Sequence, residues 1–424
     1  MKTASFRCAA EAACLHCDAT SGRFGRPWSL VQEAAAEGAV GPYATRPLVQ
    51  ISAESADTAR DWASLVRWWI VNPSKAVILA QAHRPSSAPG RRSFVRSELA
   101  APPLLPLANR PLLEHALDWL DAGGLQEVAV LAPDGLSSQT SRAVAKAGWG
   151  FELTWLERSP GAGVGASLVA LADFLGDEPF VLHLADSLSR QSLHSLMRGD
   201  PAADGEAILF VHETAGHGAS VVDLRARRSE SPFADHYAPA GVAILGSGVA
   251  EFAVALDPAP GHELEHLADS LHRGGGQVRT RRVAGWWRLG HDADALLAGN
   301  RFALEGITAD HGAASLTRTT VQGAVVAHPS AVIESSVIRG PAIIGPGARI
   351  THSYIGPYSS IGRDVVVEGS ELEHSIVFPG ARIQHLSSRL EASVVGAGAR
   401  VCREFRLPRA LRVTVGDGAE VSLA

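Results

Sequence analysis

The segment Ile344-GPGARITHSYIGPYSS-Ile361 carries one short pattern twice: an aliphatic residue, five small or turn-forming residues, and a second aliphatic residue. The same pattern returns in Val377-FPGAR-Ile383 and in Val395-GAGAR-Val401. Branched aliphatic residues recur six positions apart, with one slip by a single residue, along the series Val326, Val332, Ile338, Ile344, Ile350, Ile355, Ile361 and Val367. A period of six matches neither an α-helix nor an isolated β-strand.

A six-residue period with Gly or Pro at the turns is typical of hexapeptide repeats, which build a parallel β-helix. Each repeat forms one flat side of a triangular coil; its aliphatic side chain points to the axis, and small residues make the corner. Antiparallel strands with Gly-rich turns are the alternative, but these alternate with a period of two and turn about every ten residues. The pattern therefore favours a parallel β-helix.

Composition and charge limit the class of protein. The chain has 424 residues, 46% of them hydrophobic and 19% charged, which is enough for two hydrophobic cores and a third small unit. The formal net charge is −6 and the Lys and Arg residues are scattered, so we expect no nucleic-acid partner. No apolar run reaches membrane-spanning length and the start of the chain lacks a signal-peptide core, so we expect a cytoplasmic protein without a membrane partner.

Three of the four cysteines, Cys8, Cys14 and Cys17, lie close together near the start of the chain. Their thiolates would suit zinc, with His16 or Asp18 as a further ligand, or three irons of a cluster with one open site. The alternative is that the three cysteines are plain thiols. We favour it, because the segment that follows them is too short for the barrel domain that radical chemistry at an iron–sulfur cluster needs. The cysteines are therefore a candidate metal site that we do not expect to be loaded.

The rest of the chain divides by pattern. Residues 1–73 form an N-terminal extension of unknown role, with helices expected over 29–37 and 55–70. Strands and helices then alternate, which predicts a doubly wound parallel sheet with helices on both faces. We expect strands at 76–80, 127–132, 151–156, 180–184 and 207–211, and helices at 111–122, 166–175 and 191–198. Ligands of such sheets bind beyond the carboxyl ends of the strands, where the loop after Ala80, the loop 161–165 and Asp186 would meet.

Several stretches from residue 75 onward resemble the sugar-1-phosphate nucleotidyltransferases, in particular the long form of glucose-1-phosphate thymidylyltransferase. They include Leu105-PLANRPLLEHAL-Asp118, Asp173-FLGDEPFVLHLAD-Ser187, Val283-AGWWRLG-His291 and Glu371-LEHSIV-Phe378. The resemblance implies a Rossmann-like α/β nucleotidyltransferase domain over residues 74–306, followed by a left-handed parallel β-helix over 307–424. It also implies a homo-oligomer, and we expect the last residues, from Arg412 on, to fold back over the end of the β-helix.

The reaction implied by the resemblance joins a sugar 1-phosphate to the α-phosphorus of a nucleoside triphosphate and releases pyrophosphate. Such in-line displacement depends on positioning and on neutralising the phosphates, commonly with Mg²⁺. On the family pattern Asp186 falls on the first metal-binding aspartate, so it is an expected catalytic residue and the expected Mg²⁺ ligand. Arg84 and Arg91 of the first loop are the other expected catalytic residues, as cations for the phosphates; the alternative is that they are solvated loop charges. The expected substrate-binding residues are Gln81, Gly163, Gly165, Gly241 and Val242.

The sequence departs from the family pattern at four phosphate or metal positions. The loop after the first strand reads Gln81-AHRPSSAP-Gly90, where glycines would cradle a triphosphate. Pro102-Pro103 and Ser231 stand where the resemblance implies phosphate-binding lysines. Leu289 stands at the expected second metal aspartate, and the nearby His291 is a poor Mg²⁺ ligand.

Two hypotheses of different classes follow. In the first, the protein is an active, atypical nucleotidyltransferase that uses Asp186 and the arginines of the first loop. In the second, it is a non-catalytic or weakly active homologue that binds a nucleotide or a nucleotide-sugar; the four departures lead us to favour it. A third class, acyl transfer on the β-helix, is disfavoured because His352 and His374 are expected on its outer faces.

Overall fold

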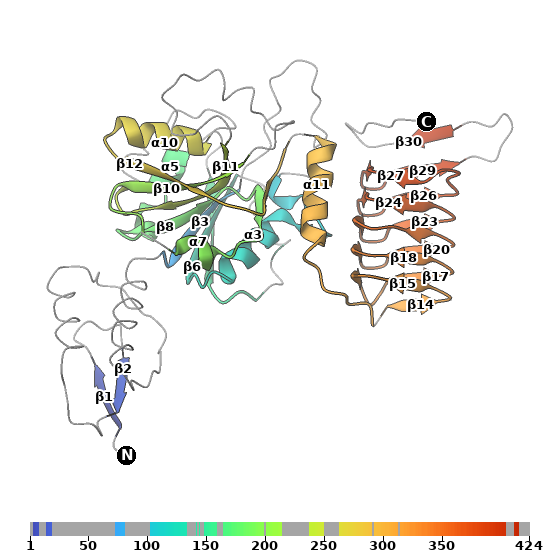
Figure 1. Ribbon diagram of the computed structural model, residues 1–424, viewed down its shortest axis with the longest axis horizontal. Coiled ribbons are helices and arrows are strands. Elements are labelled where there is room, and N and C mark those ends of the chain that lie inside the picture. The colour runs from blue at the N-terminus through green and yellow to red at the C-terminus, as the bar shows by residue number, and fades with distance from the viewer. Residues whose placement is uncertain are drawn as a thin grey trace. The chain divides into compact units, whose positions relative to one another are not determined.

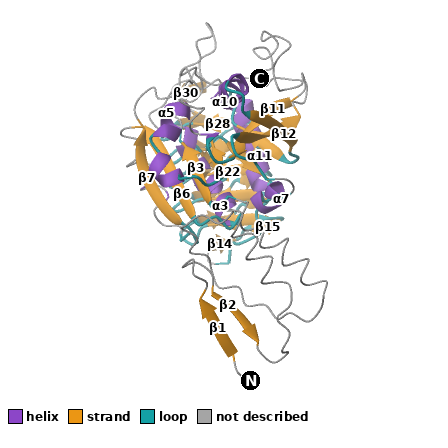
Figure 2. Cartoon of the chain, turned by 90° about the vertical axis from the view of Figure 1, so that its left-hand side faces the viewer, coloured by secondary structure: helices purple, strands orange, loops and turns teal. Residues whose placement is uncertain are grey.

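The computed structural model describes residues 3–7, 14–18, 73–80, 102–133, 141, 144, 148–158, 164–198, 201–213, 237–249, 263–290, 292–312, 314–403 and 411–414. The chain forms two compact units, Met1–Asn72 and Pro73–Ala424. In the first unit, β1 (Thr3–Arg7) and β2 (Cys14–Asp18) pair antiparallel (Figure 2). Cys8 and both helices expected before residue 73 lie outside the described residues, as do the side chains of Cys14 and Cys17.

A seven-stranded sheet forms the first half of the second unit, in the order β12-β10-β11-β8-β3-β6-β7 (Figure 1). Its strands are β3 (Lys75–Leu79), β6 (Glu127–Pro133), β7 (Glu152–Arg158), β8 (Phe180–His183), β10 (Glu206–Glu213), β11 (Tyr237–Leu245) and β12 (Gln277–Arg282). The five expected strands are therefore present. The sheet is mixed rather than wholly parallel, because β11 pairs antiparallel with both β10 and β8. An apolar run of strand length carries no information about its direction, so the sequence did not reveal this.

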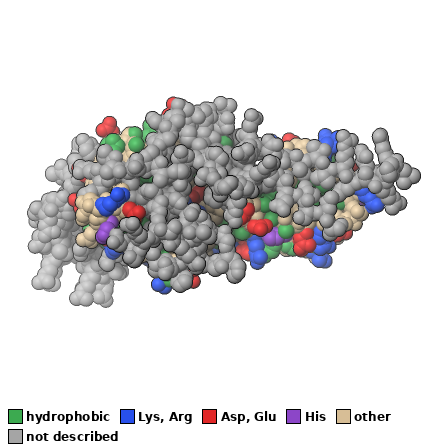
Figure 3. Space-filling view, turned by 90° about the horizontal axis from the view of Figure 1, so that it is seen from above, with side chains coloured by type: hydrophobic (Ala, Val, Ile, Leu, Met, Phe, Trp, Pro, Cys, Tyr) green, Lys and Arg blue, Asp and Glu red, His purple; other side chains and the backbone are tan. Residues whose placement is uncertain are grey.

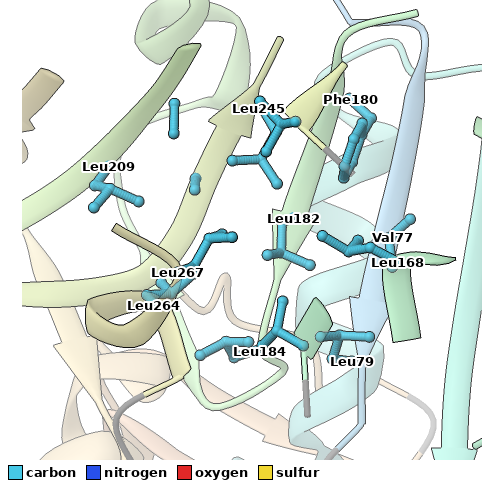
Figure 4. Close-up of a cluster of buried hydrophobic side chains, with 14 of the residues drawn as sticks. Val77, Leu79, Leu168, Phe180, Leu182, Leu184, Leu209, Leu245, Leu264 and Leu267 are labelled. Atoms are coloured by element: carbon cyan, nitrogen blue, oxygen red, sulfur yellow. The ribbon is translucent and has the colours of Figure 1, made fainter. Parts of the chain in front are cut away.

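The described helices of this half are α3 (Leu112–Asp121), α5 (Val164–Val169), α6 (Ala172–Leu175), α7 (Leu193–Met197), α10 (Glu263–Arg273) and α11 (Ala293–Leu304), of which α11 packs toward the β-helix rather than on this sheet. On α3 the buried residues recur at helical spacing, and the helix ends before Gly123 and Gly124 as expected. The single helix expected over 166–175 is instead two short ones, α5 and α6. Figure 4 shows how leucines from α5 and α10 pack onto the strands, for example Leu168 and Leu267 beside Leu182 of β8.

Three parallel sheets form the second half of this unit and wind into a left-handed β-helix (Figure 1). Its strands are β14 (Ser315–Thr317), β15 (Thr320–Gln322), β16 (Val325–Ala327), β17 (Val332–Glu334), β18 (Val337–Arg339), β19 (Ala342–Ile344), β20 (Arg349–Thr351), β21 (Tyr354–Ile355), β22 (Ser359–Ile361), β23 (Val366–Glu368), β24 (Glu371–Glu373), β25 (Ile376–Val377), β26 (Arg382–Gln384), β27 (Leu390–Glu391), β28 (Val394–Val395) and β29 (Arg400–Arg403).

The predicted axis-facing positions of the aliphatic series are confirmed from Ile338 onward. Before Ile338 the predicted positions were wrong by one residue. Ile338, Ile344, Ile350, Ile355, Ile361 and Val367 are all at most 1% exposed. At the start, however, Ala327 and Ile333 are buried, while Val326 and Val332 are partly exposed. Adjacent strand residues face opposite sides, so a shift by one residue exchanges inside for outside. A five-residue step occurs in each early coil, from Ile333 to Ile338 and again from Ile350 to Ile355.

At the end of the β-helix, one of its three sheets is extended by part of the segment that was expected to fold back. The last described strand, β30 (Leu411–Thr414), turns back and pairs antiparallel with β29. Such pairing satisfies backbone groups that an open strand edge would leave without partners.

A buried asparagine joins the β-helix to the α/β part. Asn300 of α11 is fully buried; its Oδ1 accepts hydrogen bonds from the backbone N–H of Ala108 at 3.0 Å and from Ser360 Oγ at 2.7 Å. Its Nδ2 donates to the carbonyl of Tyr358 at 3.2 Å. Trp287 and Leu296 share a hydrophobic cluster with Ile376 of β25. The two parts therefore share one packed junction, whereas the domain limits at 73/74 and 306/307 stay predictions.

Acidic and basic side chains lie interspersed over the described surface that faces the viewer in Figure 3. On the β-helix, for example, Arg389 is paired with Glu371 at 3.1 Å and with Glu373 at 2.7 Å. Within the described residues, no helix combines the length and the apolar content needed to span a bilayer.

Candidate functional site

Asp186 lies just beyond the carboxyl end of β8, where a doubly wound sheet places its ligands. Two short strands fix it there, because β9 (Ser187–Ser189) pairs antiparallel with β13 (Trp286–Arg288), with Ser187 opposite Arg288. The backbone N–H of Leu289 donates to the Asp186 carbonyl at 2.7 Å and closes this ladder. The segment after the two tryptophans is thereby held beside Asp186.

The side chain that faces Asp186 is Arg288. Its Nε donates to Asp186 Oδ2 at 2.8 Å, and its Nη1 donates to the carbonyl of Pro239 at 3.2 Å. The two side chains are 23% and 20% exposed, so the ion pair lies at a partly open surface. Leu289, which the sequence analysis placed at the second metal aspartate, packs instead against the hydrophobic cluster around Trp287. Neighbouring residues of an extended segment point to opposite sides, so Arg288 rather than Leu289 meets Asp186.

Gly241 of β11 forms the floor beside this ion pair. Its φ is +80°, a left-handed backbone conformation that side chains rarely adopt, and a Cβ at this position would overlap Asp186 Oδ1. The same Cβ would lie 3.3 Å from Ser187 Oγ and 3.5 Å from Arg288 Nε. Three polar groups therefore converge on Gly241, whose backbone is buried beneath them, and the sugar contact expected at Gly241 and Val242 stays a prediction. Val242 itself is buried in the sheet opposite His183.

His183 is a buried, neutral histidine next to the pair. Its Nδ1 accepts a hydrogen bond from the backbone N–H of Ala185 at 2.8 Å, which places the ring proton on Nε2. Burial lowers the pKa of His183 to about 4; the Asp186 carboxylate counters this in part, and Arg288 adds to it. Burial likewise lowers the pKa of His212, where the Glu213 carbonyl opposes the change and Arg288 reinforces it. Both imidazoles are therefore uncharged at neutral pH.

A cavity of about 390 Å³ adjoins the site and is lined by residues from α3, β8, β9 and α11, among them His115, Trp119, His183, Ser187, Arg190 and Phe302. The Trp119 ring lies edge-on to His183, with ring centroids 5.7 Å apart. Arg190 lies over the Phe302 ring at 4.3 Å and pairs with Glu305. Because His183 and Ser187 also lie beside Asp186, the cavity and the ion pair share a wall.

The residues present do not fit the Mg²⁺ that the resemblance implies. Asp186 Oδ2 is occupied by Arg288, and Oδ1 is buried without a hydrogen-bond partner. The described residues contain no cluster of three or more His, Cys, Asp or Glu side chains that could hold a metal. A guanidinium in contact with the carboxylate also repels a cation. Metal coordination at Asp186 is therefore disfavoured by both geometry and charge.

Some of the other predicted site residues lie within the described part of the chain, and the rest lie outside it. Gly165 lies buried in α5, and Pro103 lies buried in the 3₁₀ turn Pro102–Leu104, so no cation comes from that position. Gly163 and the predicted first-loop residues Gln81, Arg84 and Arg91 lie outside the described residues, together with Ser231 and His291. The structure therefore brings together Asp186, Gly241 and Val242 of the predicted set.

The sequence analysis missed Arg288, Ser187 and His183. Arg288 and His183 both stand inside the stretches quoted for the resemblance. Side-chain alternation along the Trp286–Arg288 strand could have separated Arg288 from its neighbour Leu289. Ser187 and His183 gave no such signal, since a serine and a histidine near a strand end are commonplace.

The chain is similar to known proteins over most of its length, although no protein-family model matches it. It is 30% identical to a glucose-1-phosphate thymidylyltransferase of Streptomyces antibioticus over 363 residues, which is 82% of this chain and 99% of the relative. It is 28% identical to the enzyme of the same name from Streptomyces griseus, with the same coverage. A low-salt glycan biosynthesis nucleotidyltransferase of Haloferax volcanii is 30% identical over 334 residues, 76% of this chain and 93% of the relative. Together with the mixed α/β sheet, the β-helix and the strand-end site, these similarities show that the chain belongs to the sugar-1-phosphate nucleotidyltransferase family.

Proposed function

We propose that this protein binds a nucleotide or a nucleotide-sugar at the strand-end site around Asp186 and Gly241, and that it transfers nucleotidyl groups weakly or not at all. The observation that carries this proposal is the Asp186–Arg288 ion pair. Nucleotidyl transfer from a triphosphate needs its developing charge neutralised in a fixed geometry, usually by a divalent cation held between acidic side chains and the phosphates. Here the Asp186 carboxylate is already engaged by Arg288.

Binding is supported by features that do not depend on a metal. Gly241 is buried beneath Asp186, and Asp186 Oδ1 and Ser187 Oγ beside it are buried polar atoms without hydrogen-bond partners. Such atoms are costly unless a ligand hydroxyl or water completes their hydrogen bonds. The relatives named for glucose 1-phosphate and thymidylyl transfer indicate a nucleoside diphosphate sugar as the class of ligand.

The test is a panel of nucleoside triphosphates, sugar 1-phosphates and nucleoside diphosphate sugars, measured both as thermal shift and as pyrophosphate release. We expect a nucleoside diphosphate sugar to raise the melting temperature, because a ligand that binds only the folded state stabilises it. We expect little or no pyrophosphate from any pair of substrates. Rapid release with one pair would refute weak turnover, and the absence of a shift with every compound would refute binding.

An active, atypical enzyme is the second candidate, and one observation favours it. Arg288 supplies a permanent positive charge at the rim where phosphates are expected, and arginine pairs well with phosphate oxygens. In that case Arg84 and Arg91 of the first loop are the proposed further cations. Pyrophosphate release that persists in excess EDTA would support this candidate over the first.

A further inference from the structure

The three sheets of the β-helix differ in what lies against them. The sheet that contains β22 contacts α11, and Ser360 donates a hydrogen bond to Asn300, so part of that sheet is covered by the α/β part. The sheet β14-β17-β20-β23-β26-β29-β30 is a different face of the coil, here called the arginine face. Strands β17, β20, β23 and β26 each bury their middle residue and leave both neighbours exposed or partly exposed. Arg349, Arg382 and Arg400 are exposed on this face.

The register between coils stacks the outward residues of the arginine face into two columns. One column holds the residue before each middle residue, and the other holds the residue after it. The first, the arginine column, consists of Val332, Arg349, Val366, Arg382 and Arg400. The second, the glutamate column, consists of Glu334, Thr351, Glu368, Gln384 and Cys402. Each glutamate therefore stands one coil away from at least one arginine of the other column.

The charge of the arginine column is not neutralised within the described part of the chain. Arg349, Arg382 and Arg400 make no side-chain hydrogen bond or ion pair there. Arg382 is moreover the direct register partner of Arg400 on the next coil. Like charges opposite each other on neighbouring strands are destabilising. An isolated chain therefore carries an uncompensated positive column on this face.

The glutamate column carries the complementary charge. Glu334 is exposed and makes no side-chain hydrogen bond or ion pair with the described residues. Glu368 is 41% exposed; it accepts a hydrogen bond from Gln384 Nε2 at 3.0 Å and lies 3.9 Å from His385 Nε2. Among the described side chains, no arginine comes within 4.0 Å of either glutamate. The two columns thus lie side by side, and neither neutralises the other.

We propose that the arginine face binds the arginine face of a second copy of the chain, in a dimer whose twofold axis runs parallel to the coil axis of the β-helix. This axis places the arginine column of each copy opposite the glutamate column of the other, coil by coil. Arg349 then stands one coil from both Glu334 and Glu368 of the second copy, and Arg382 stands one coil from the same Glu368. Successive coils are about 4.8 Å apart, a distance that an arginine side chain spans. The contact is isologous, so each ion pair forms twice and the assembly closes with an even number of subunits.

The order of charges disfavours the opposite arrangement. A twofold axis across the coil would set the arginine column of one copy against that of the other, in reverse order. Centred on Val366, it would bring Arg349 of one copy against Arg382 of the other. Juxtaposed like charges oppose association. A polyanion would match the arginine column but repel the glutamate column, so a second copy is the occupant that fits both.

Light scattering of the full chain after size-exclusion chromatography measures the number of subunits. We expect two chains, or a larger even number, at low ionic strength, where exposed charges are least screened. One chain per particle at every protein concentration would overturn the proposal and leave the face to a partner of another kind. An odd number of subunits, such as three, would overturn the twofold contact.

A charge swap tests the arrangement itself. Glu368→Arg puts a positive charge beside Arg349 and Arg382 of the second copy, and the double variant Arg349→Glu with Arg382→Glu puts negative charges beside its Glu368. Each variant alone is expected to show half the wild-type number of subunits, because its contacts become repulsive. An equimolar mixture should restore the wild-type number, since all contacts in a mixed dimer again join opposite charges. Variants that keep the wild-type number, or a mixture that stays dissociated, would contradict the proposal.

Glu391→Arg is the matched control. Glu391 is exposed on β27, which belongs to another sheet of the coil, and its carboxylate has no partner among the described residues. Reversing its charge should leave the number of subunits unchanged. Circular dichroism checks that every variant is folded, and recovery in the mixture itself requires two folded variants. Equal dissociation of the folded control and of folded Glu368→Arg would refute the assignment of the contact to the arginine face.

Discussion

Removing the Asn300 side chain is expected to loosen the junction between the α/β part and the β-helix. In Asn300→Ala, three hydrogen bonds at 2.7–3.2 Å disappear together, and the N–H of Ala108 and the hydroxyl of Ser360 lose their shared acceptor. Each lost bond costs about 1 kcal/mol, and each buried group left without a partner costs about 1–3 kcal/mol before any water enters. Because Asn300 is fully buried, we expect a loss of about 3–5 kcal/mol in unfolding free energy.

Urea unfolding followed by circular dichroism and by tryptophan fluorescence measures this loss. Asn109→Ala is the matched control, since Asn109 crosses the same junction through one bond, from its Nδ2 to the Ile361 carbonyl at 2.7 Å. We expect the control to lose about 1–2 kcal/mol, because alanine also adopts the left-handed φ of +61° at this position less readily than asparagine. A free-energy change in Asn300→Ala no larger than that of the control would refute the reasoning, because the buried network would then add nothing to a single part-buried bond.

The folded-state pKa of His183, about 4, lies below its unfolded value of 6.5. The unfolding free energy should therefore fall by about 3 kcal/mol as the pH drops from 6.5 to 4, and it should stay constant above pH 6.5. His183→Gln should remove this part of the pH dependence in urea titrations. Gly241→Ala should lower the melting temperature more than Gly124→Ala, because both glycines have φ near +80° but only at Gly241 would the Cβ overlap Asp186; equal shifts would contradict the overlap. Ile344→Asp puts a charge on the axis of the β-helix and should cost about 3 kcal/mol or more, so a variant as stable as the wild type by urea unfolding would exclude an axial Ile344. We also predict a homo-oligomer to which the β-helix contributes, and light scattering should show fewer subunits, or poor folding, after truncation at Leu304; an intact oligomer would argue against that contribution.

Much of the fold could be predicted from the sequence, because the signals were local and repeated. The six-residue period required only that each coil resemble the next, and burial of Ile338, Ile344 and Ile350 follows directly from it. The strands of the α/β part were equally visible, since a strand buried on both faces is an unbroken apolar run. The position of Asp186 at the carboxyl end of β8 also followed from local order along the chain.

What only the tertiary structure decided depends on pairing between distant segments. Which strands lie side by side decides three features: the direction of β11, the register at the start of the β-helix, and the side chain that pairs with Asp186. A shift by one residue turns Leu289 toward the core and Arg288 toward Asp186, and no local pattern marks that choice because both positions follow the same two tryptophans. Sequence alone thus indicated that Asp186 lies at a strand end, whereas backbone hydrogen bonding between Leu289 and Asp186, 103 positions apart, determined that a guanidinium faces the carboxylate.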